Sequence, residues 1–174
     1  LGPYTTLFRS ADNGASVALV ARRADRLAAF KAELEKSGAK AVAIEADVNS
    51  RDDMKRAFNE AEKAFGTVTI LVNNAGVAQK PLRVTEVSAE EWRRVLGTDL
   101  DAVFYWAQEA ANRMLSARKQ GTIVNIASVL GFGVAKGTAA YAVAKAAVVQ
   151  TTKALSVELA FKGVRVNAIA PGWF

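Results

Sequence analysis

VTILVNNAG, residues 68–76, joins an apolar run to a sharp turn, and this combination decides the fold class. Val68 to Val72 are almost all apolar, without the alternation of a strand that has one solvated face. A short run rich in β-branched residues predicts a strand buried on both faces. The Asn-Asn-Ala-Gly that follows predicts a turn directly after the strand. A strand of this kind belongs to a parallel sheet that helices cover on both sides.

The same alternation of strands and helices extends along the chain in both directions. Four further apolar runs predict strands at Ser16–Ala21, Ala41–Ala46, Gly121–Ala127 and Val164–Ala170. Helices are predicted over residues 24–38, 51–66, 88 to about 118, and 139–162. Two capping boxes, Ser50 with Asp53 and Ser88 with Glu91, mark helix starts. Right-handed crossovers between parallel strands then give a Rossmann-like, doubly wound α/β fold.

Ligands of doubly wound sheets bind beyond the carboxyl ends of the strands. Polar or glycine-containing segments follow each predicted strand here: Arg22-Arg23, Asp47, Asn73–Gly76, Ser128 and Pro171-Gly172. Taken singly, each of these segments is an ordinary turn, cap or solvated charge. Together, in order and at the strand ends, they predict a ligand site.

The composition excludes several classes of protein. The 174 residues, 51% of them hydrophobic, suffice for one globular domain. The sequence contains no run of about 18 apolar residues, so we expect no membrane partner. The absence of Cys and His removes disulfides and the usual metal ligands, so we expect no metal. With no secretory signal visible, we expect a cytoplasmic protein. The net charge of +6 is spread over helices where Lys and Arg alternate with Glu, which argues against a nucleic-acid partner.

Tyr141 and Lys145, in YAVAK, are the residues best suited to acid–base chemistry. Their spacing of four residues places both side chains on one helical face. An ammonium one turn away favours the phenolate and is expected to lower the pKa of the tyrosine toward neutrality. The hydroxyl of Ser128 is available to bind the same substrate oxygen. The alternative is an amphipathic helix with a lysine that extends to solvent and a serine that only caps a turn.

These motifs together resemble the short-chain dehydrogenase/reductase family, from about Asn13 to the end of the chain. The matching stretches are Asp47-Val48, NNAG (73–76), NIAS (125–128), YAVAK (141–145) and RVNAIAPG (165–172). The resemblance implies that Ser128 polarises the substrate carbonyl, Tyr141 is the acid–base residue, and Lys145 lowers its pKa and binds the nicotinamide ribose. It implies cofactor contacts for Asp47, Val48, Asn74, Ala75, Gly76, Pro171 and Gly172, and a mainly structural role for Asn125.

The residues that follow the strand at Ser16–Ala21, which corresponds to the second strand of the family, indicate which cofactor is preferred. Members that prefer NAD place a carboxylate there to bind the ribose hydroxyls. This chain has Arg22 and Arg23 instead, and guanidinium groups suit a 2′-phosphate. We therefore expect NADP(H) to be favoured over NAD(H), with Arg22 the stronger candidate. The alternative is an exposed charge pair without a ligand.

The chain departs from the family pattern at Asp99. The family usually has Asn at this place, and here Asp99 lies in GTDLD (97–101). A carboxylate cannot donate as an amide does, and when ionised it adds negative charge near Tyr141 and Lys145. Asp99 can still bind water or backbone groups, so the substitution calls the proton relay of the family into question without excluding it.

Both ends differ from the family. No Gly-rich loop for the pyrophosphate precedes Gly14, and residues 11–14 resemble the last turn of a missing helix. Residues 3–10 back-translate to a string that resembles a sequencing adapter, although YTTLF is also β-prone. We therefore expect 1–10 to be non-native, and 11–174 to be a partial dinucleotide-binding domain lacking the first strand, the Gly-rich loop and the C-terminal strand. Such a chain is expected to be poorly stable and to bind dinucleotide weakly, if at all.

The resemblance implies an oxidoreductase that transfers hydride between a nicotinamide and a carbonyl or alcohol, and a homodimer or homotetramer. A 3-oxoacyl carrier-protein reductase and a sugar or small-alcohol dehydrogenase both fit. Leu130–Gly137 is expected to line the substrate pocket, but the small residues of this segment do not indicate which substrate binds. A different reading is a non-catalytic remnant that acts as a structural or interaction module.

Overall fold

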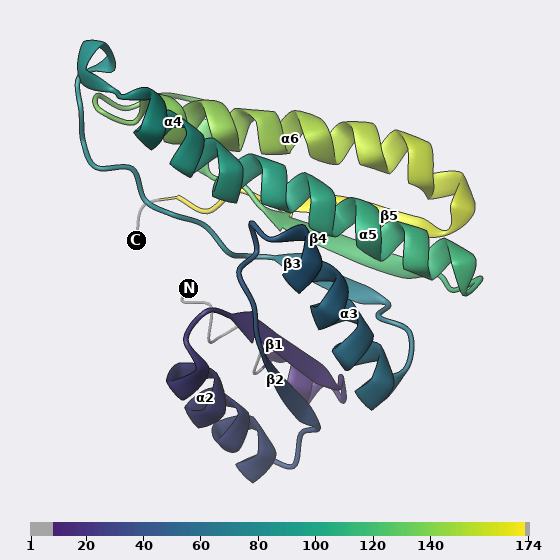
Figure 1. Ribbon diagram of the computed structural model, residues 1–174. Coiled ribbons are helices and arrows are strands. Elements are labelled where there is room, and N and C mark those ends of the chain that lie inside the picture. The colour runs from purple at the N-terminus through teal and green to yellow at the C-terminus, as the bar shows by residue number, and fades with distance from the viewer. Residues whose placement is uncertain (1–8, 173–174) are drawn as a thin grey trace. The chain divides into compact units, whose positions relative to one another are not determined.

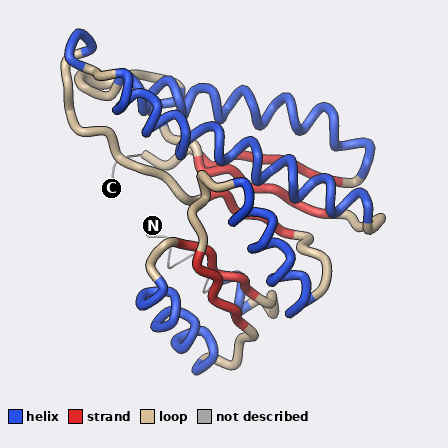
Figure 2. Tube along the Cα trace, in the orientation of Figure 1, coloured by secondary structure: helices blue, strands red, loops and turns tan. Residues whose placement is uncertain are grey.

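The computed structural model describes residues 9–172 and divides the chain into two compact units, one up to Val68 and the other from Thr69 onward (Figure 1). The strands all pair in parallel, as a two-stranded sheet β1-β2 and a three-stranded sheet β3-β4-β5. Helices alternate with the strands along the chain (Figure 2). The predicted α/β architecture with parallel strands is therefore confirmed.

Little of the predicted non-native segment 1–10 can be judged, because residues 1–8 lie outside the described part of the chain. Residues 9–12 are helical, and Gly14 follows with a φ of 83°. This agrees with the expectation that residues 11–14 close a helix. Glycine suits this position because a positive φ carries a steric cost for other residues.

In the first unit, β1 (Val17–Ala21) and β2 (Ala41–Glu45) pair in register from Val17 opposite Ala41. Helix α2 (Ala24–Lys36) forms the crossover between them, and α3 (Arg51–Phe65) follows β2. The core between α2 and the strands consists of small and aliphatic side chains: Ala11, Val17, Leu19, Leu27, Leu34 and Ala41. Burial of these apolar side chains is the main force that stabilises this unit.

The start of α3 corrects one detail of the sequence interpretation. Ser50 caps the helix as predicted, and its hydroxyl accepts from Asp53 N at 3.2 Å. In a capping box, the Asp53 carboxylate would return to the Ser50 N–H. Instead, Ser50 N donates to Asp47 O, and Asp53 binds the Asp47 N–H. The capping-box prediction is wrong in this second half, because the turn before the helix supplies a competing donor.

In the second unit, β3 (Ile70–Asn73), β4 (Gly121–Ile126) and β5 (Val164–Ile169) form a sheet in that order. Two helical crossovers connect them. The first runs through α4 (Ala89–Leu96) and α5 (Ala102–Ser116), and the second through α6 (Ala139–Leu159). Helices α5 and α6 lie side by side along the strands (Figures 1 and 2). These crossovers bring the carboxyl ends of β3, β4 and β5 to one edge of the sheet.

The long helix predicted from Ser88 to near Arg118 is interrupted. Ser88 caps α4 as predicted, with its hydroxyl accepting from Glu91 N at 3.1 Å. Between α4 and α5, Gly97–Asp101 forms a π-helical segment. Segments of this type inside α-helices occur frequently at functional sites. Within residues 9–172, no helix combines the length and the apolar character needed to cross a membrane.

A buried polar ladder connects the sheet to its helices. Asn73 Nδ2 on β3 donates to Asn125 Oδ1 on β4 at 3.0 Å and to the Val103 carbonyl of α5 at 3.1 Å. Asn125 Nδ2 donates to Thr152 Oγ1 on α6 at 2.9 Å. Thr152 Oγ1 in turn donates to the Val148 carbonyl at 2.8 Å. Buried polar groups are costly unless paired, so this ladder holds β3, β4, α5 and α6 in one relative position.

Substitution of Asn125 by Ala is expected to destabilise the second unit by about 2–4 kcal/mol, because Thr152 loses a donor and Asn73 an acceptor. Urea unfolding followed by tryptophan fluorescence measures this loss. Asn112→Ala, at an exposed position of α5, is the control and should shift the free energy of unfolding by no more than about 0.5 kcal/mol. Equal effects of the two substitutions would show that the ladder carries no stability.

Candidate functional site

The predicted site residues fall in both units, and each set is described within its own unit. The second unit contains the residues with acid–base character, Ser128, Tyr141 and Lys145, together with Asp99. It also contains the turn of residues 73–76 that follows β3. These groups come from different elements, and they meet near the carboxyl end of β4.

Lys145 is held tightly at this place. It is only 5% exposed, and its Nζ donates to the Ile126 carbonyl at the end of β4 at 2.9 Å. The same Nζ lies 3.2 Å from Asp99 Oδ1 and 5.5 Å from the centre of the Tyr141 ring. The ammonium is therefore shared between a backbone carbonyl and a carboxylate, with the tyrosine ring beside it.

Asp99 is fully buried, on the π-helical segment between α4 and α5. Its Oδ2 accepts from the Val77 N–H at 3.1 Å, and its Oδ1 makes the ion pair with Lys145 without a well-directed hydrogen bond. Burial raises the pKa of Asp99 above its usual value, and the Lys145 charge and the Val77 N–H oppose that rise. Asp99 thus occupies the centre of the site, bound to a backbone N–H as the sequence allowed.

The behaviour of Tyr141 corrects an expectation. Burial raises the pKa of Tyr141, a hydrogen bond with Ser128 lowers it, and the charge of Asp99 raises it again. The net shift is upward, so the predicted lowering toward neutrality is not seen, and burial of Tyr141 is the main reason. Sequence spacing located the Tyr–Lys pair, but it could not show the burial of Tyr141 or the Asp99 carboxylate beside it.

Ser128 follows β4 and caps the short 3-10 helix η3 (Val129–Gly131), where its Oγ accepts from Leu130 N at 3.2 Å. It is buried, and its hydroxyl lowers the pKa of Tyr141. Gly131 allows η3 to pack on α6, since a Cβ there would lie 2.8 Å from the Lys145 carbonyl. The segment that begins here was predicted to line the substrate pocket.

The turn after β3 contacts the same cluster. Residues 74–76 of this turn are exposed. The backbone of Gly76 nevertheless lies close to the Asp99 carboxylate. A Cβ on Gly76 would lie 2.5 Å from Asp99 Oδ1 and 3.7 Å from Lys145 Nζ. Glycine is therefore required here by space. Pro171, after β5, accepts from Val129 N at 3.0 Å and so joins the end of that strand to η3, and Gly172 follows in an exposed position.

Gln79 is a site residue that the sequence did not indicate. Its Oε1 accepts from the Tyr141 N–H at 3.0 Å, which ties the segment after the NNAG turn to the first turn of α6. Its Nε2 is buried and has no hydrogen-bond partner among the described residues. The two residues are 62 positions apart in the chain, so no local pattern predicts the contact.

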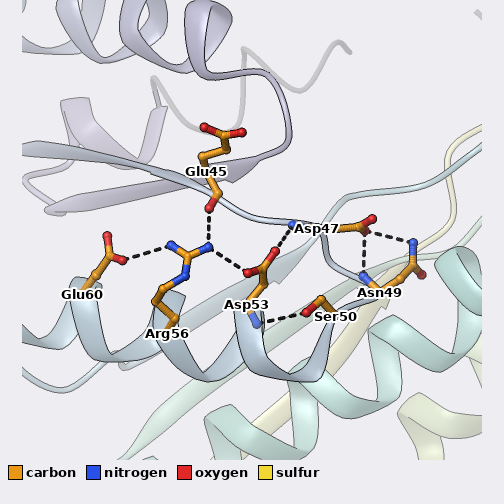
Figure 3. Close-up of polar contacts among 7 residues, drawn as sticks. All are labelled: Glu45, Asp47, Asn49, Ser50, Asp53, Arg56 and Glu60. Atoms are coloured by element: carbon orange, nitrogen blue, oxygen red, sulfur yellow. Dashed lines mark hydrogen bonds and ion pairs between the residues drawn. The ribbon is translucent and has the colours of Figure 1, made fainter.

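In the first unit, the turn after β2 is held by a network around Asp53 (Figure 3). The Asp47 N–H donates to Asp53 Oδ2 at 2.9 Å, and Arg56 donates to Asp53 Oδ1 at 2.9 Å and to the Glu45 carbonyl at 2.7 Å. The Asp47 N–H and Arg56 hold the pKa of Asp53 below its usual value. Asp47 Oδ1 in turn accepts from the backbone and side chain of Asn49, at 3.0 and 3.1 Å.

The other predicted cofactor residues of this unit are accessible. Arg22 and Arg23 are exposed between β1 and α2, and Arg23 is the N-cap residue of α2 without a side-chain capping bond. Val48 is partly buried beside Asp47. Exposed guanidinium groups at a helix N-terminus fit a phosphate group, because the helix N–H groups and the Arg charges both favour an anion.

Comparison with known proteins identifies the family of the chain. The family model for short chain dehydrogenases matches residues 4–174. A 3beta-hydroxysteroid dehydrogenase from Eggerthella lenta is 35% identical over 94% of this chain, and a 3-oxoacyl-[acyl-carrier-protein] reductase from Staphylococcus epidermidis is 37% identical over 94%. The chain spans 63% and 66% of the length of these relatives. A solved structure from Sinorhizobium meliloti, described as a short-chain alcohol dehydrogenase, superposes with a TM-score of 0.93 at 34% identity, covering 98% of this chain and 67% of that one.

Substitution of Gly76 by Ala is expected to destabilise the second unit by about 1–3 kcal/mol, because the added methyl group collides with the buried Asp99 carboxylate. Urea unfolding measures the loss. Gly133→Ala is the matched control, since a Cβ there meets nothing within 4 Å. If both variants unfold at the same urea concentration, Gly76 does not support the Asp99–Lys145 pair.

Proposed function

The chain belongs to the short-chain dehydrogenase family, and we propose that the protein containing it is an NADP(H)-dependent oxidoreductase acting on a carbonyl or alcohol. The observation that carries this proposal is the cluster of Ser128, Tyr141 and Lys145 at the end of β4. The Lys145 ammonium lies beside the Tyr141 ring, and the Ser128 hydroxyl lowers the pKa of Tyr141, as expected of an assembled catalytic group.

NADPH, when bound, supplies a hydride to the carbonyl carbon. In that step the Tyr141 hydroxyl donates its proton to the carbonyl oxygen, and the Ser128 hydroxyl hydrogen-bonds to the same oxygen and orients it. Lys145 provides positive charge next to the tyrosine and a donor group for the ribose hydroxyls. The reverse reaction uses the same groups, with Tyr141 as the base that removes the alcohol proton.

The residues proposed to bind the cofactor are divided between the two units, and each set is considered within its own unit. Exposed Arg22 and Arg23 suit the 2′-phosphate that distinguishes NADP(H) from NAD(H), whereas a carboxylate would suit NAD(H). Asp47 and Val48, on the turn that Asp53 holds, are proposed to contact the adenine. Residues 74–76 and the Pro171-Gly172 pair, all beyond strand ends in the second unit, are proposed to line the nicotinamide end.

We propose a ketone on an apolar framework as the substrate class. The segment after η3 carries two highly exposed apolar side chains, Phe132 at 72% and Val134 at 86%, and it begins beside Ser128. A 3-oxoacyl group, as named for one relative, fits these side chains better than a sugar does. A steroid, as named for the other relative, fits by the same criterion.

Two further expectations concern the whole protein. Val143 and Val157 on α6, and Phe161 after it, are exposed apolar residues. Such side chains suit a contact with a second copy of the chain, in line with the predicted homodimer or homotetramer. A cytoplasmic location stays a prediction.

Tyr141→Phe in the full gene is expected to lower kcat for ketone reduction by about 10²–10⁴-fold, because the proposed proton donor to the carbonyl oxygen is removed. KM should change little, since the ring is kept. The measurement is the rate of NADPH oxidation with 3-oxoacyl thioester and ketosteroid substrates, and Tyr105→Phe, on α5, is the control. A whole protein that oxidises NADPH with none of these substrates, or one in which Tyr141→Phe is fully active, would favour the non-catalytic reading.

Arg22→Ala is expected to raise KM for NADPH by about 10–100-fold and to leave KM for NADH unchanged, because a charged hydrogen bond to the 2′-phosphate is lost. The KM values for both cofactors in the whole protein measure this. Arg26→Ala, an exposed position on α2, is the control for general charge. Equal changes in KM for the two cofactors would show that Arg22 does not bind the 2′-phosphate.

A further inference from the structure

The ion pair between Asp99 and Lys145 lies directly beside Tyr141. Both partners are buried, at 0% and 5% exposure, and their charged atoms are 3.2 Å apart. Away from solvent, opposite charges this close largely cancel each other's field at a third group. Tyr141, whose ring centre is 5.5 Å from Nζ, therefore experiences much less of the ammonium charge than an unpaired lysine would exert.

Three independent features hold Asp99 in place. The Val77 N–H donates to its Oδ2 at 3.1 Å, the π-helical segment 97–101 carries it into the interior, and Gly76 leaves the space it occupies. A carboxylate that is fully removed from water loses several kcal/mol of solvation, so it persists only where such partners exist. The arrangement is that of a built ion pair and not of a chance surface contact.

We propose that Asp99 is a positioning residue that draws the Lys145 ammonium toward itself and the Ile126 carbonyl, and thereby shifts the working range of Tyr141 to alkaline pH. Under this proposal Tyr141 stays protonated across the neutral range, which suits it to donate a proton to a carbonyl oxygen. The alcohol-oxidising direction, which needs the phenolate, then gains rate only as the pH rises. This catalytic consequence rests on the proposed function, but the electrostatic effect does not.

The other groups that act on the pair are few. Arg94, from α4, adds positive charge to the surroundings of Asp99 and opposes the rise of its pKa, together with Lys145 from α6. Tyr141 is affected by burial, by the Ser128 hydroxyl at the end of β4, and by Asp99. The direction in which Asp99 moves the pKa of Tyr141 is upward, as the proposal requires.

The first test is the titration of Tyr141 in the 174-residue chain. The chain has three tyrosines, and the NMR signal of Tyr141 is the one that disappears in Tyr141→Phe. The chemical shift of its ring carbon is then measured as a function of pH. Asp99→Asn keeps the shape and an acceptor for Val77, and it is expected to lower the midpoint by about 1 unit or more. Asp101→Asn, an exposed position in the same π-helical segment, is the matched control and should leave the midpoint unchanged. An unchanged midpoint in Asp99→Asn would overturn the proposal.

A second measurement uses the native sequence and does not depend on how well the variant folds. Because the folded-state pKa of Asp99 is raised, the folded state binds its proton more tightly than the unfolded state does. The resulting stability is present below the usual value of 3.8 and is lost as the pH rises through the folded pKa. The proposed ion pair requires an ionised Asp99 near Lys145 at neutral pH, so the carbon shift of the Asp99 carboxyl should show that its ionisation is complete there. A carboxyl that is still protonated at neutral pH would overturn the proposal.

The third measurement is the pH profile of ketone reduction by the whole protein. The rate should fall on the alkaline side as Tyr141 ionises, and Asp99→Asn should move that fall to lower pH by the same interval as in the titration. An active protein whose alkaline fall does not move would contradict the proposal. A protein without reductase activity, in which the Tyr141 midpoint nevertheless shifts in the chain, would overturn the proposed function and support the electrostatic role of Asp99.

Discussion

The position of the Lys145 ammonium is the constraint on which the candidate site depends. It donates to the Ile126 carbonyl, pairs with Asp99 and lies beside the Tyr141 ring, and so joins β4, the π-helical segment and α6. The turn after β3 packs against the same ion pair, and Gly76 leaves the space there that the Asp99 carboxylate occupies. A buried charge requires partners on several sides, and here these partners come from segments far apart in the chain.

Beneath this centre, the polar ladder from Asn73 through Asn125 to Thr152 holds the supporting elements together. It crosses from β3 to β4 and on to α6, and Asn125 directly precedes Ile126, whose carbonyl binds Lys145. Apolar packing of Ala140, Ala144 and Val148 stabilises α6, but such contacts tolerate small shifts. The directional bonds of the ladder are less tolerant, so the positions of Ser128 and Tyr141 follow from them.

The errors of the sequence interpretation share one physical origin. The capping box at Ser50 was half right, because Asp53 found a better donor in the backbone of Asp47. The predicted lowering of the Tyr141 pKa is not seen, because burial raises that pKa and Asp99, which pairs with Lys145 from another segment, adds to the rise. In both cases the local pattern was correct, but a group that is distant in the sequence or outside the motif competed for the same partner.

By itself, the sequence determined the parallel α/β architecture, the order of the strands and helices, and the family, and it led to the prediction of Ser128, Tyr141 and Lys145 as site residues. These follow from periodicity, turn chemistry and short motifs, which are local properties of the chain. Only the tertiary structure decided that Asp99 pairs with Lys145, that Gln79 binds the first turn of α6, and that Gly76 lies against Asp99. Hydrogen bonds and ion pairs depend on distance in space, and a chain folded around a sheet brings together residues whose separation in the sequence carries no information about their contact.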